Sequence, residues 1–262
     1  LDDITIREAL ILPDDSDSEA TVQSILTPDG EGGASFQVAS KGADDEWRQH
    51  VAGTIRLAPA DAATSTGDSS LSAVRARCQN RLDADAFYAG VFDAGLQYGP
   101  AFRGIKELWR HDGEALGAIG LPESLLADRA PYSVHPALLD AVLQVVLAAT
   151  TEIAESTPSN TVYLPAAIDR VSLHTSHPDR LWGHCRVRPI DTTTPGSLAA
   201  DIRVFDEAGV LVAEVEGFHL RRASQAALQR LAEPKLDDWL YEVVWEPKGL
   251  NGQDAFDSGN QS

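Results

Sequence analysis

The sequence is short of positive charge. It carries 21 Lys and Arg against 40 Asp and Glu, a formal net charge of −19, and its pI is near 4.6. A surface this acidic repels phosphate backbones and anionic lipids, so we expect neither nucleic-acid nor membrane partners. The chain also lacks an apolar run long enough to cross a bilayer, and no basic-then-apolar signal segment opens it. These absences predict a cytoplasmic protein.

Sulfur is scarce as well. There is no Met, and the two cysteines, Cys78 and Cys185, are far apart and lie in neither a C-x-x-C nor a His-rich neighbourhood. That pattern argues against a metal site and a disulfide framework, so we expect two reduced core residues. Because the chain starts at Leu1, we expect it to be a piece of a longer polypeptide. Its 262 residues, 43% hydrophobic and 23% charged, suffice for one large or two small globular domains.

The stretch SVHPALLDAVLQVVLAAT, Ser133–Thr150, predicts a helix that is apolar nearly all the way round. Pro136 suits its first turn. Leucine and valine cover most of the circumference, so we expect protein on nearly every side of the helix. Asp140 and Gln144 are the exceptions, and their i,i+4 spacing makes them neighbours on one face. We expect room in front of that face, because it also carries the small residues Ala137, Ala141 and Ala148.

Spacing alone leaves two interpretations of Asp140 open. An aspartate in the second turn of a helix is often only a partner of the N-terminal dipole, and a glutamine one turn later is often solvated. Alternatively, apolar neighbours enclose Asp140 and raise its pKa, so that it can deliver a proton to a leaving group near neutral pH. The apolar surroundings favour the second interpretation.

The rest of the chain predicts two sheet-forming units. Residues 1–58 predict a β-meander with no helix to cover it, and residues 59–77 are small and polar, as in a linker. Residues 78–223 predict a helix at Ala84–Gly95 and further strands on both sides of the central helix. Residues 224–262 predict a linker or short helix, a strand at Asp237–Pro247 and a disordered tail. The strand candidates of the second unit are Phe102–Arg110, Ala115–Leu121, Ala167–Leu173, Leu181–Val187, Leu198–Phe205 and Val210–Leu220. The simplest assembly is an α+β fold with antiparallel sheets wrapped around the central helix.

Two motifs are specific enough to suggest a family: YGPAFRG at Tyr98–Gly104 and HPALLDAVLQ at His135–Gln144. With them, the chain from Leu1 to Arg222 resembles the dehydratase domain of a modular type I polyketide synthase. The resemblance implies a double hotdog, with the active site in a tunnel between the hotdogs and the first hotdog lacking its N-terminal helix in this chain. The supporting stretches are WRQHVAGT (Trp47–Thr54), LPAAIDRVSLH (Leu164–His174), VEGFHLRR (Val215–Arg222) and LYEVVW (Leu240–Trp245), the last resembling the strand that opens a following ketoreductase region.

The resemblance also implies roles for particular residues. Asp140 is the acid that protonates the leaving β-hydroxyl, and Gln144 fixes its orientation. Tyr98 shapes the tunnel wall near the β-hydroxyl and the thioester, although a tyrosine ahead of a strand is also a common core residue. The other residues of the implied substrate-contacting set are Gly99, Pro100, Phe102, His135, which also caps the central helix, and Leu164 and Pro165, which line the acyl end.

The base that the family uses is missing from this sequence. It is a histidine in an H-x-x-x-G-x-x-x-x-P motif ahead of the first hotdog's helix, and neither motif nor helix occurs here. His50 is a near match, but its glycine comes one residue early and it fits the family's later W-x-x-H strand, so we interpret it as structural. We expect the base to lie outside this chain, in a segment of the working protein. The alternative is a protein that lacks half of its acid–base pair.

The implied reaction removes water from a β-hydroxyacyl thioester carried on the phosphopantetheine of an acyl carrier protein, and it needs no metal or further cofactor. It requires a base at Cα and an acid at the β-oxygen, both within reach of one substrate in a water-excluding tunnel. A pyran cyclase, a double-bond isomerase and a non-catalytic structural domain remain alternatives. The expected partners are the carrier protein, the ketoreductase and other synthase domains, and a second copy in a homodimer. Candidates for a basic patch that docks the carrier protein are Arg103, Lys106 and Arg110.

Overall fold

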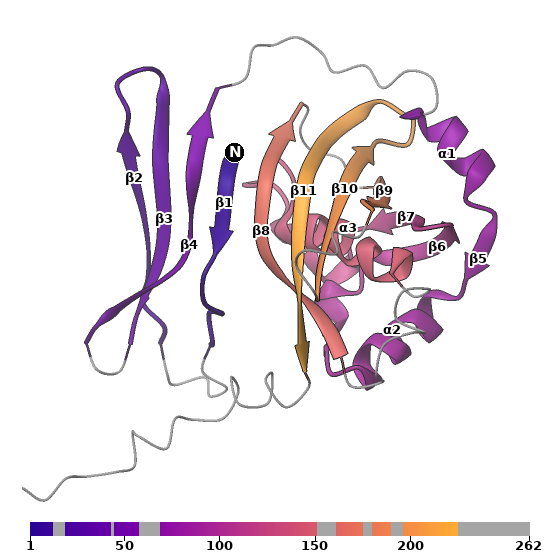
Figure 1. Ribbon diagram of the computed structural model, residues 1–262, viewed down its shortest axis with the longest axis horizontal. Helices are drawn as coiled ribbons and strands as arrows, with labels where there is room; N and C mark the ends of the chain where they lie inside the picture. The colour runs from indigo at the N-terminus through magenta and orange to yellow at the C-terminus, as the bar shows by residue number, and fades with distance from the viewer. Residues whose placement is uncertain are drawn as a thin grey trace, which may run out of the picture. The chain divides into compact units, whose positions relative to one another are not determined.

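One antiparallel sheet runs through the part of the chain that the computed structural model describes, which comprises residues 1–12, 19–42, 45–57, 69–150, 161–174, 180–189 and 196–224. Its strands lie in the order β2-β3-β4-β1-β8-β11-β10-β9-β7-β6-β5. Figure 1 shows β9, β7, β6 and β5 curling around a central helix, while β1 to β4 extend the sheet on the other side of β8. The strands are β1 (Asp2–Ile6), β2 (Val22–Pro28), β3 (Gly33–Lys41), β4 (Trp47–Arg56), β5 (Asn80–Leu82), β6 (Ile105–His111), β7 (Glu114–Gly120), β8 (Thr161–Leu173), β9 (Arg180–Val187), β10 (Ser197–Phe205) and β11 (Leu211–Ser224).

The central helix is α3, Pro136–Ala149, as the sequence predicts. Pro136 occupies its first turn, and the His135 side chain caps it by accepting a hydrogen bond from the Ala137 N–H at 3.1 Å. The helix packs against β6, β7, β9 and β10. Its valines form the middle of the main core, with Val142, Val145 and Val146 each 1% exposed or less.

The expected room in front of the small residues of α3 is absent. Ala137, Ala141 and Ala148 are each 3% exposed or less. A Cβ added to Gly104 would lie 2.8 Å from the Ala141 Cβ, so the backbone at the start of β6 presses directly on the helix. Short side chains here permit close packing and do not leave space. The more open side of α3 carries Leu139, which is 38% exposed, and the half-buried Asp140.

The meander predicted for residues 1–58 is confirmed as the strands β1 to β4. No helix occurs among the described residues of this stretch. β1 pairs with β4 on one side and with β8 on the other, so the meander and the sheet around α3 are continuous. Within β4, His50 is buried and its ring nitrogens lie 2.7 Å from Ser40 Oγ and 3.1 Å from the Glu8 carbonyl oxygen. His50 is therefore part of the sheet's own packing.

The predicted linker at residues 59–77 is wrong over its last seven residues, which form helix α1, Leu71–Arg77. Ser70 caps it through a hydrogen bond from Ala73 N–H. Leu71 and Val74 are buried in a second apolar cluster with Cys78, Leu116, Phe205 and Leu211. These two apolar residues are enough to anchor the short helix, because partners far along the chain complete the cluster. The helix predicted at Ala84–Gly95 is confirmed as α2, Ala84–Asp93.

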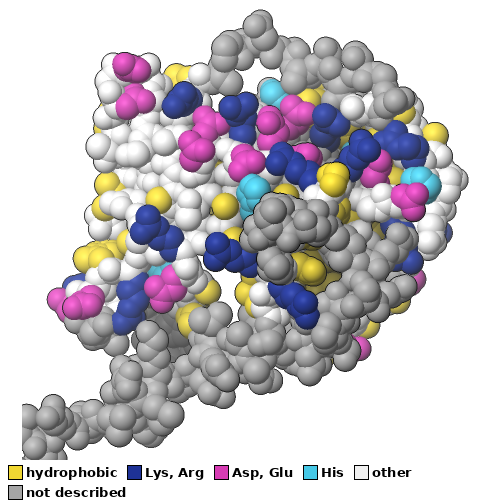
Figure 2. Space-filling view, viewed as in Figure 1, with side chains coloured by type: hydrophobic (Ala, Val, Ile, Leu, Met, Phe, Trp, Pro, Cys, Tyr) yellow, Lys and Arg dark blue, Asp and Glu magenta, His cyan; other side chains and the backbone are white. Residues whose placement is uncertain are grey.

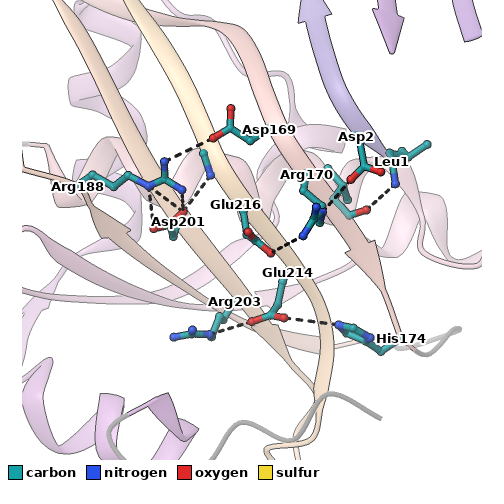
Figure 3. A network of polar contacts seen from close by, with 12 residues as sticks. Leu1, Asp2, Asp169, Arg170, His174, Arg188, Asp201, Arg203, Glu214 and Glu216 are labelled. Atoms are coloured by element: carbon teal, nitrogen blue, oxygen red, sulfur yellow. Dashed lines mark hydrogen bonds and ion pairs between the residues drawn. The ribbon is translucent and has the colours of Figure 1, made fainter. Parts of the chain in front are cut away.

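A ladder of ion pairs crosses the outward face of β8, β11 and β10. Figure 2 shows basic and acidic side chains intermingled on this side, so the acidic excess is not gathered into one patch here. Figure 3 shows three connected groups within the ladder. Arg170 binds Asp2 at 2.8 Å, Arg188 binds Asp201 at 2.7 Å, and Glu214 bridges Arg203 and His174.

A bulge interrupts the pairing of β10 with β11 beside these ion pairs. Phe218 pairs with Ala200 and Val215 with Ile202, so Glu216 and Gly217 together face Asp201. Gly217 has a φ of +60°, and its N–H donates to Asp201 Oδ1 at 2.9 Å. A Cβ at this position would overlap the Asp169 carboxylate. Only glycine fits both the backbone angle and the space.

The two cysteines are both buried and unbonded to each other, as predicted. Burial raises the pKa of Cys78 to about 11 and raises the pKa of Cys185 as well, so both are unreactive thiols at neutral pH. No helix within the described ranges is long and apolar enough to cross a membrane. The predictions for residues 224–262, apart from the last residue of β11, lie outside the described residues.

Candidate active site

Asp140 and Gln144 form a bonded pair one turn apart on α3. Gln144 Nε2 donates to Asp140 Oδ2 at 2.6 Å. The glutamine is 2% exposed and the aspartate is half-buried. Burial raises the pKa of Asp140 above its usual value, and the hydrogen bond from Gln144 offsets only part of that rise. The site therefore combines a carboxyl group whose pKa is raised with an amide that fixes one oxygen of that carboxyl group.

Tyr88 on α2 reaches the same pair from the side. Its hydroxyl donates to Gln144 Oε1 at 3.0 Å and accepts a hydrogen bond from the Ile105 N–H at 3.1 Å. The second N–H of the Gln144 amide donates to the Phe102 carbonyl oxygen at 3.0 Å. Every hydrogen-bonding group of this buried amide is thus occupied. Tyr88 is the site residue that the sequence analysis missed, and its only signal was an aromatic residue on one face of a predicted helix.

Tyr98 lies near both groups. Its ring makes an edge contact with Tyr88 at a centroid distance of 6.3 Å. Burial, the negative charge of Asp140 and the neighbouring Tyr88 raise its pKa to about 12, so it keeps its hydroxyl hydrogen at neutral pH. Tyr98 thus lies close enough to Asp140 to feel its charge, while its role in the wall of a substrate tunnel stays a prediction. Arg103 holds the segment from outside by donating to the Tyr98 carbonyl oxygen at 2.9 Å.

The GPAF segment forms a single 3₁₀ turn, Pro100–Phe102, between α2 and β6. Gly99 and Pro100 are exposed, and the Phe102 side chain is 46% exposed. The backbone of Phe102, by contrast, faces inward: its carbonyl oxygen accepts a hydrogen bond from Gln144 Nε2. The motif is therefore tied to the site through its main chain.

Three further predicted residues lie at the start of α3 or on β8. His135 uses Nδ1 to cap α3, and its ring makes an edge contact with Tyr132 at 5.1 Å. Leu164 is half-buried and Pro165 is exposed, both on β8 opposite β11. Contact of these residues with a substrate stays a prediction.

An open hollow of about 550 Å³ lies beside Tyr88, between the start of α2 and the strands β5 and β6. Tyr88 and Ile105 form part of its wall, and Arg103 and Lys106 lie on it with Arg81 and three acidic residues. Its charges are thus mixed. Across the described ranges, no group of three or more His, Cys, Asp or Glu side chains is arranged to hold a metal ion.

The described chain therefore combines a hotdog-type sheet with a central helix that carries a partly buried acid. The family model of the polyketide synthase dehydratase N-terminal domain matches residues 66–230. The chain belongs to this family, the dehydratase domains of polyketide synthases, and its fold is their α+β double hotdog.

The relatives agree with this assignment. The chain is 32% identical over 258 residues to polyketide synthase GfsE of Streptomyces halstedii, and 30% identical over 187 residues to erythronolide synthase EryA2 of Saccharopolyspora erythraea. These matches include 94% and 70% of this chain but only 6% and 4% of the relatives, which are far longer. Among solved structures, the dehydratase domain of the CurJ module of curacin polyketide synthase is 30% identical, with a TM-score of 0.76 over 87% of this chain and 76% of that one.

Proposed function

We propose that the chain carries the acid half of a dehydratase that removes water from a β-hydroxyacyl thioester bound to an acyl carrier protein. The observation that carries this proposal is the Asp140–Gln144 pair, a half-buried carboxyl group with a raised pKa and one oxygen fixed by a fully buried amide. The product is the α,β-enoyl thioester. The reaction needs no metal or further cofactor beyond the phosphopantetheine arm of the substrate.

The geometry suits protonation of a leaving hydroxyl. A β-hydroxyl leaves as water only if an acid supplies a proton while a base removes the hydrogen at Cα. Burial raises the pKa of Asp140 and so favours its neutral form, which carries the proton to be transferred. Tyr98 keeps its own hydrogen and can donate to an oxygen of the substrate. The family motif for the base, a histidine in H-x-x-x-G-x-x-x-x-P, does not occur in this sequence.

Inactive variants of a related domain support these roles. Solved structures of the CurK dehydratase, 29–30% identical to this chain, include an inactive aspartate-to-asparagine mutant and an inactive histidine-to-phenylalanine mutant. Such a pair fits an aspartate acid and a histidine base. In this chain Asp140 is the aspartate of the family motif, and its hydrogen bonding matches the role of acid.

Asp140→Asn tests the proposal directly. We expect it to lower turnover by about 100-fold or more, because the amide cannot supply the proton, while the fold stays intact. The assay uses the synthase polypeptide that contains this chain and a β-hydroxyacyl thioester, with loss of one water followed by mass spectrometry. Asp169→Asn, on the outward face of β8, is the matched control. Full activity of Asp140→Asn would reject the proposal. If the wild type gives a product with the mass of the substrate but a different retention time, the reaction is cyclisation instead.

We further propose that the acyl carrier protein docks at Arg103, Lys106 and Arg110. Arg103 and Lys106 are exposed beside the hollow next to Tyr88, and Arg110 is half-buried further along β6. Since a rim charge acts mainly on the association rate, Lys106→Glu should lower kcat/KM severalfold for carrier-bound substrate and leave a free thioester analogue unaffected. Lys41→Glu on β3 is the control. Equal kcat/KM of both variants on carrier-bound substrate would reject this site.

The remaining partners follow from the family. The relatives are modular synthases, so we propose that this domain works beside a ketoreductase and other synthase domains in the cytoplasm. We also propose that it forms a homodimer. Light scattering coupled to size-exclusion chromatography gives the molar mass, and a monomer at micromolar concentration would reject the dimer.

A further inference from the structure

The orientation of the Gln144 amide is fixed by two backbone groups, one that can only donate a hydrogen bond and one that can only accept one. The Ile105 N–H can only donate, so the Tyr88 oxygen accepts from it at 3.1 Å, and the Tyr88 hydrogen must go elsewhere. It goes to Gln144 Oε1 at 3.0 Å, which fixes that atom as the acceptor. The Phe102 carbonyl oxygen can only accept, and it takes one Nε2 hydrogen at 3.0 Å.

These contacts leave a single direction for the last hydrogen. With Oε1 on Tyr88 and one N–H on Phe102, the other N–H of Gln144 points to Asp140 Oδ2 at 2.6 Å. A flipped amide would set a carbonyl oxygen against the Phe102 carbonyl and an NH₂ group against the Tyr88 hydrogen. Both contacts would be unfavourable in a site where Tyr88 is 5% and Gln144 2% exposed, so the flip is strongly disfavoured.

We propose that Tyr88 is a positioning residue for the dehydration: through Gln144 it fixes which oxygen of Asp140 carries the transferable proton. Oδ2 always receives the amide hydrogen, so the neutral carboxyl group carries its own hydrogen on Oδ1. Asp140 therefore donates its proton from a single oxygen, Oδ1. This inference rests on the proposed function for its catalytic meaning, but the hydrogen-bond relay can be tested without turnover.

Tyr98 and Tyr88, the two tyrosines that interact electrostatically with Asp140, do not obscure such a test. The pKa of each is raised to about 12, chiefly by burial. Arg103, whose guanidinium lies 5.6 Å from the centre of the Tyr88 ring, stays positively charged throughout. The protonation of Asp140 can thus be followed at acidic and neutral pH with constant charge on these neighbours.

The experiment measures the titration of Asp140 by ¹³C NMR in the full 262-residue chain labelled at aspartate Cγ, with the signal assigned by its loss in Asp140→Asn. Tyr88→Phe frees the Gln144 amide and weakens its hydrogen bond to the carboxylate. The titration midpoint should rise by about half a pH unit. In a Gln144→Leu background the same substitution should cause no further change, because Tyr88 acts through the amide.

Thr150→Val serves as the control, since it removes another buried hydroxyl from the far end of α3, where Thr150 Oγ1 donates to the Leu147 carbonyl oxygen at 2.9 Å. It should leave the midpoint unchanged. An unshifted midpoint in folded Tyr88→Phe, or an equal shift with and without Gln144, would overturn the inference. If Tyr88→Phe fails to fold, hydrogen exchange of the side-chain amides in the wild type decides. Exchange at Gln144 as fast as at the exposed Gln97 would contradict the relay.

Turnover then separates this inference from the proposed function. If both hold, Tyr88→Phe lowers kcat with KM nearly unchanged, and the alkaline limb of the pH–rate profile moves with the titration midpoint of Asp140. If Asp140→Asn retains full activity while the midpoint of Tyr88→Phe still moves, the relay stands and the assignment of Asp140 as acid fails.

Discussion

Glu114, at the start of β7, gathers basic side chains from two other elements. Arg77 of α1 lies 2.9 Å and His184 of β9 lies 3.0 Å from its Oε2. Burial raises the pKa of Glu114, but the hydrogen bonds from Arg77 and His184 outweigh it and the net pKa is lowered. Burial lowers the pKa of His184 despite the opposing effect of Glu114. The pair therefore consists of a carboxylate and a neutral imidazole that donates through Nε2.

This residue pair predicts a loss of stability in mild acid. The folded pKa of His184 is below its unfolded value of about 6.5, so its contribution is complete above that pH and declines as the pH falls below it. The free energy of unfolding, measured by denaturant titration, should fall between about pH 7.5 and about pH 5.5. His184→Gln keeps a donor to Glu114 but does not titrate, so it should reduce that fall. Exposed His111→Gln is the control, and equal falls in both variants would contradict the prediction.

At the scale of elements, the bulge at Gly217 joins β8, β10 and β11. Gly217→Ala places a Cβ against Asp169 and holds a left-handed φ that an L side chain adopts at a cost. We expect it to lower the free energy of unfolding by about 2 kcal/mol or more. Gly90→Ala on α2 provides the comparison, because nothing lies within 4 Å of its added Cβ and alanine favours a helix. Thermal unfolding of both variants checks this, and similar midpoints would show that the bulge adapts.

Elements with a strong local pattern were predictable from sequence. The leucines and valines of α3 and the proline at its start predicted that helix. Strand ends were less certain: β8 begins at Thr161, before the predicted Ala167, because pairing with β11 extends it. Helix α1 was missed because Phe205, far along the chain, completes its apolar cluster. The bond from Tyr88 to Gln144 spans 56 residues, and such contacts leave no local pattern.

The whole molecule carries more negative than positive charge, yet many ion pairs form on the outward face of β8, β11 and β10 (Figures 2 and 3). Salt weakens both the general repulsion and these local attractions. Exposed ion pairs each contribute little, whereas a net charge of −19 opposes the compact state throughout. Raising the ionic strength from about 0.01 M to about 0.15 M should therefore raise the Tm. Circular dichroism at both concentrations tests this, and a lower Tm at 0.15 M would show that the ion pairs dominate.

The position of β1 between β4 and β8 has a consequence for biosynthesis. Ile4 pairs with Ile168, so the ribosome must add more than 160 residues before the second neighbour of this strand exists. At elongation rates of roughly 5–20 residues per second, that interval lasts about 10–30 s. Throughout it, the nascent meander offers an open hydrogen-bonding edge to other chains. Translation speed and chaperone access, more than the stability of the finished sheet, should therefore govern how much of this protein reaches its native state.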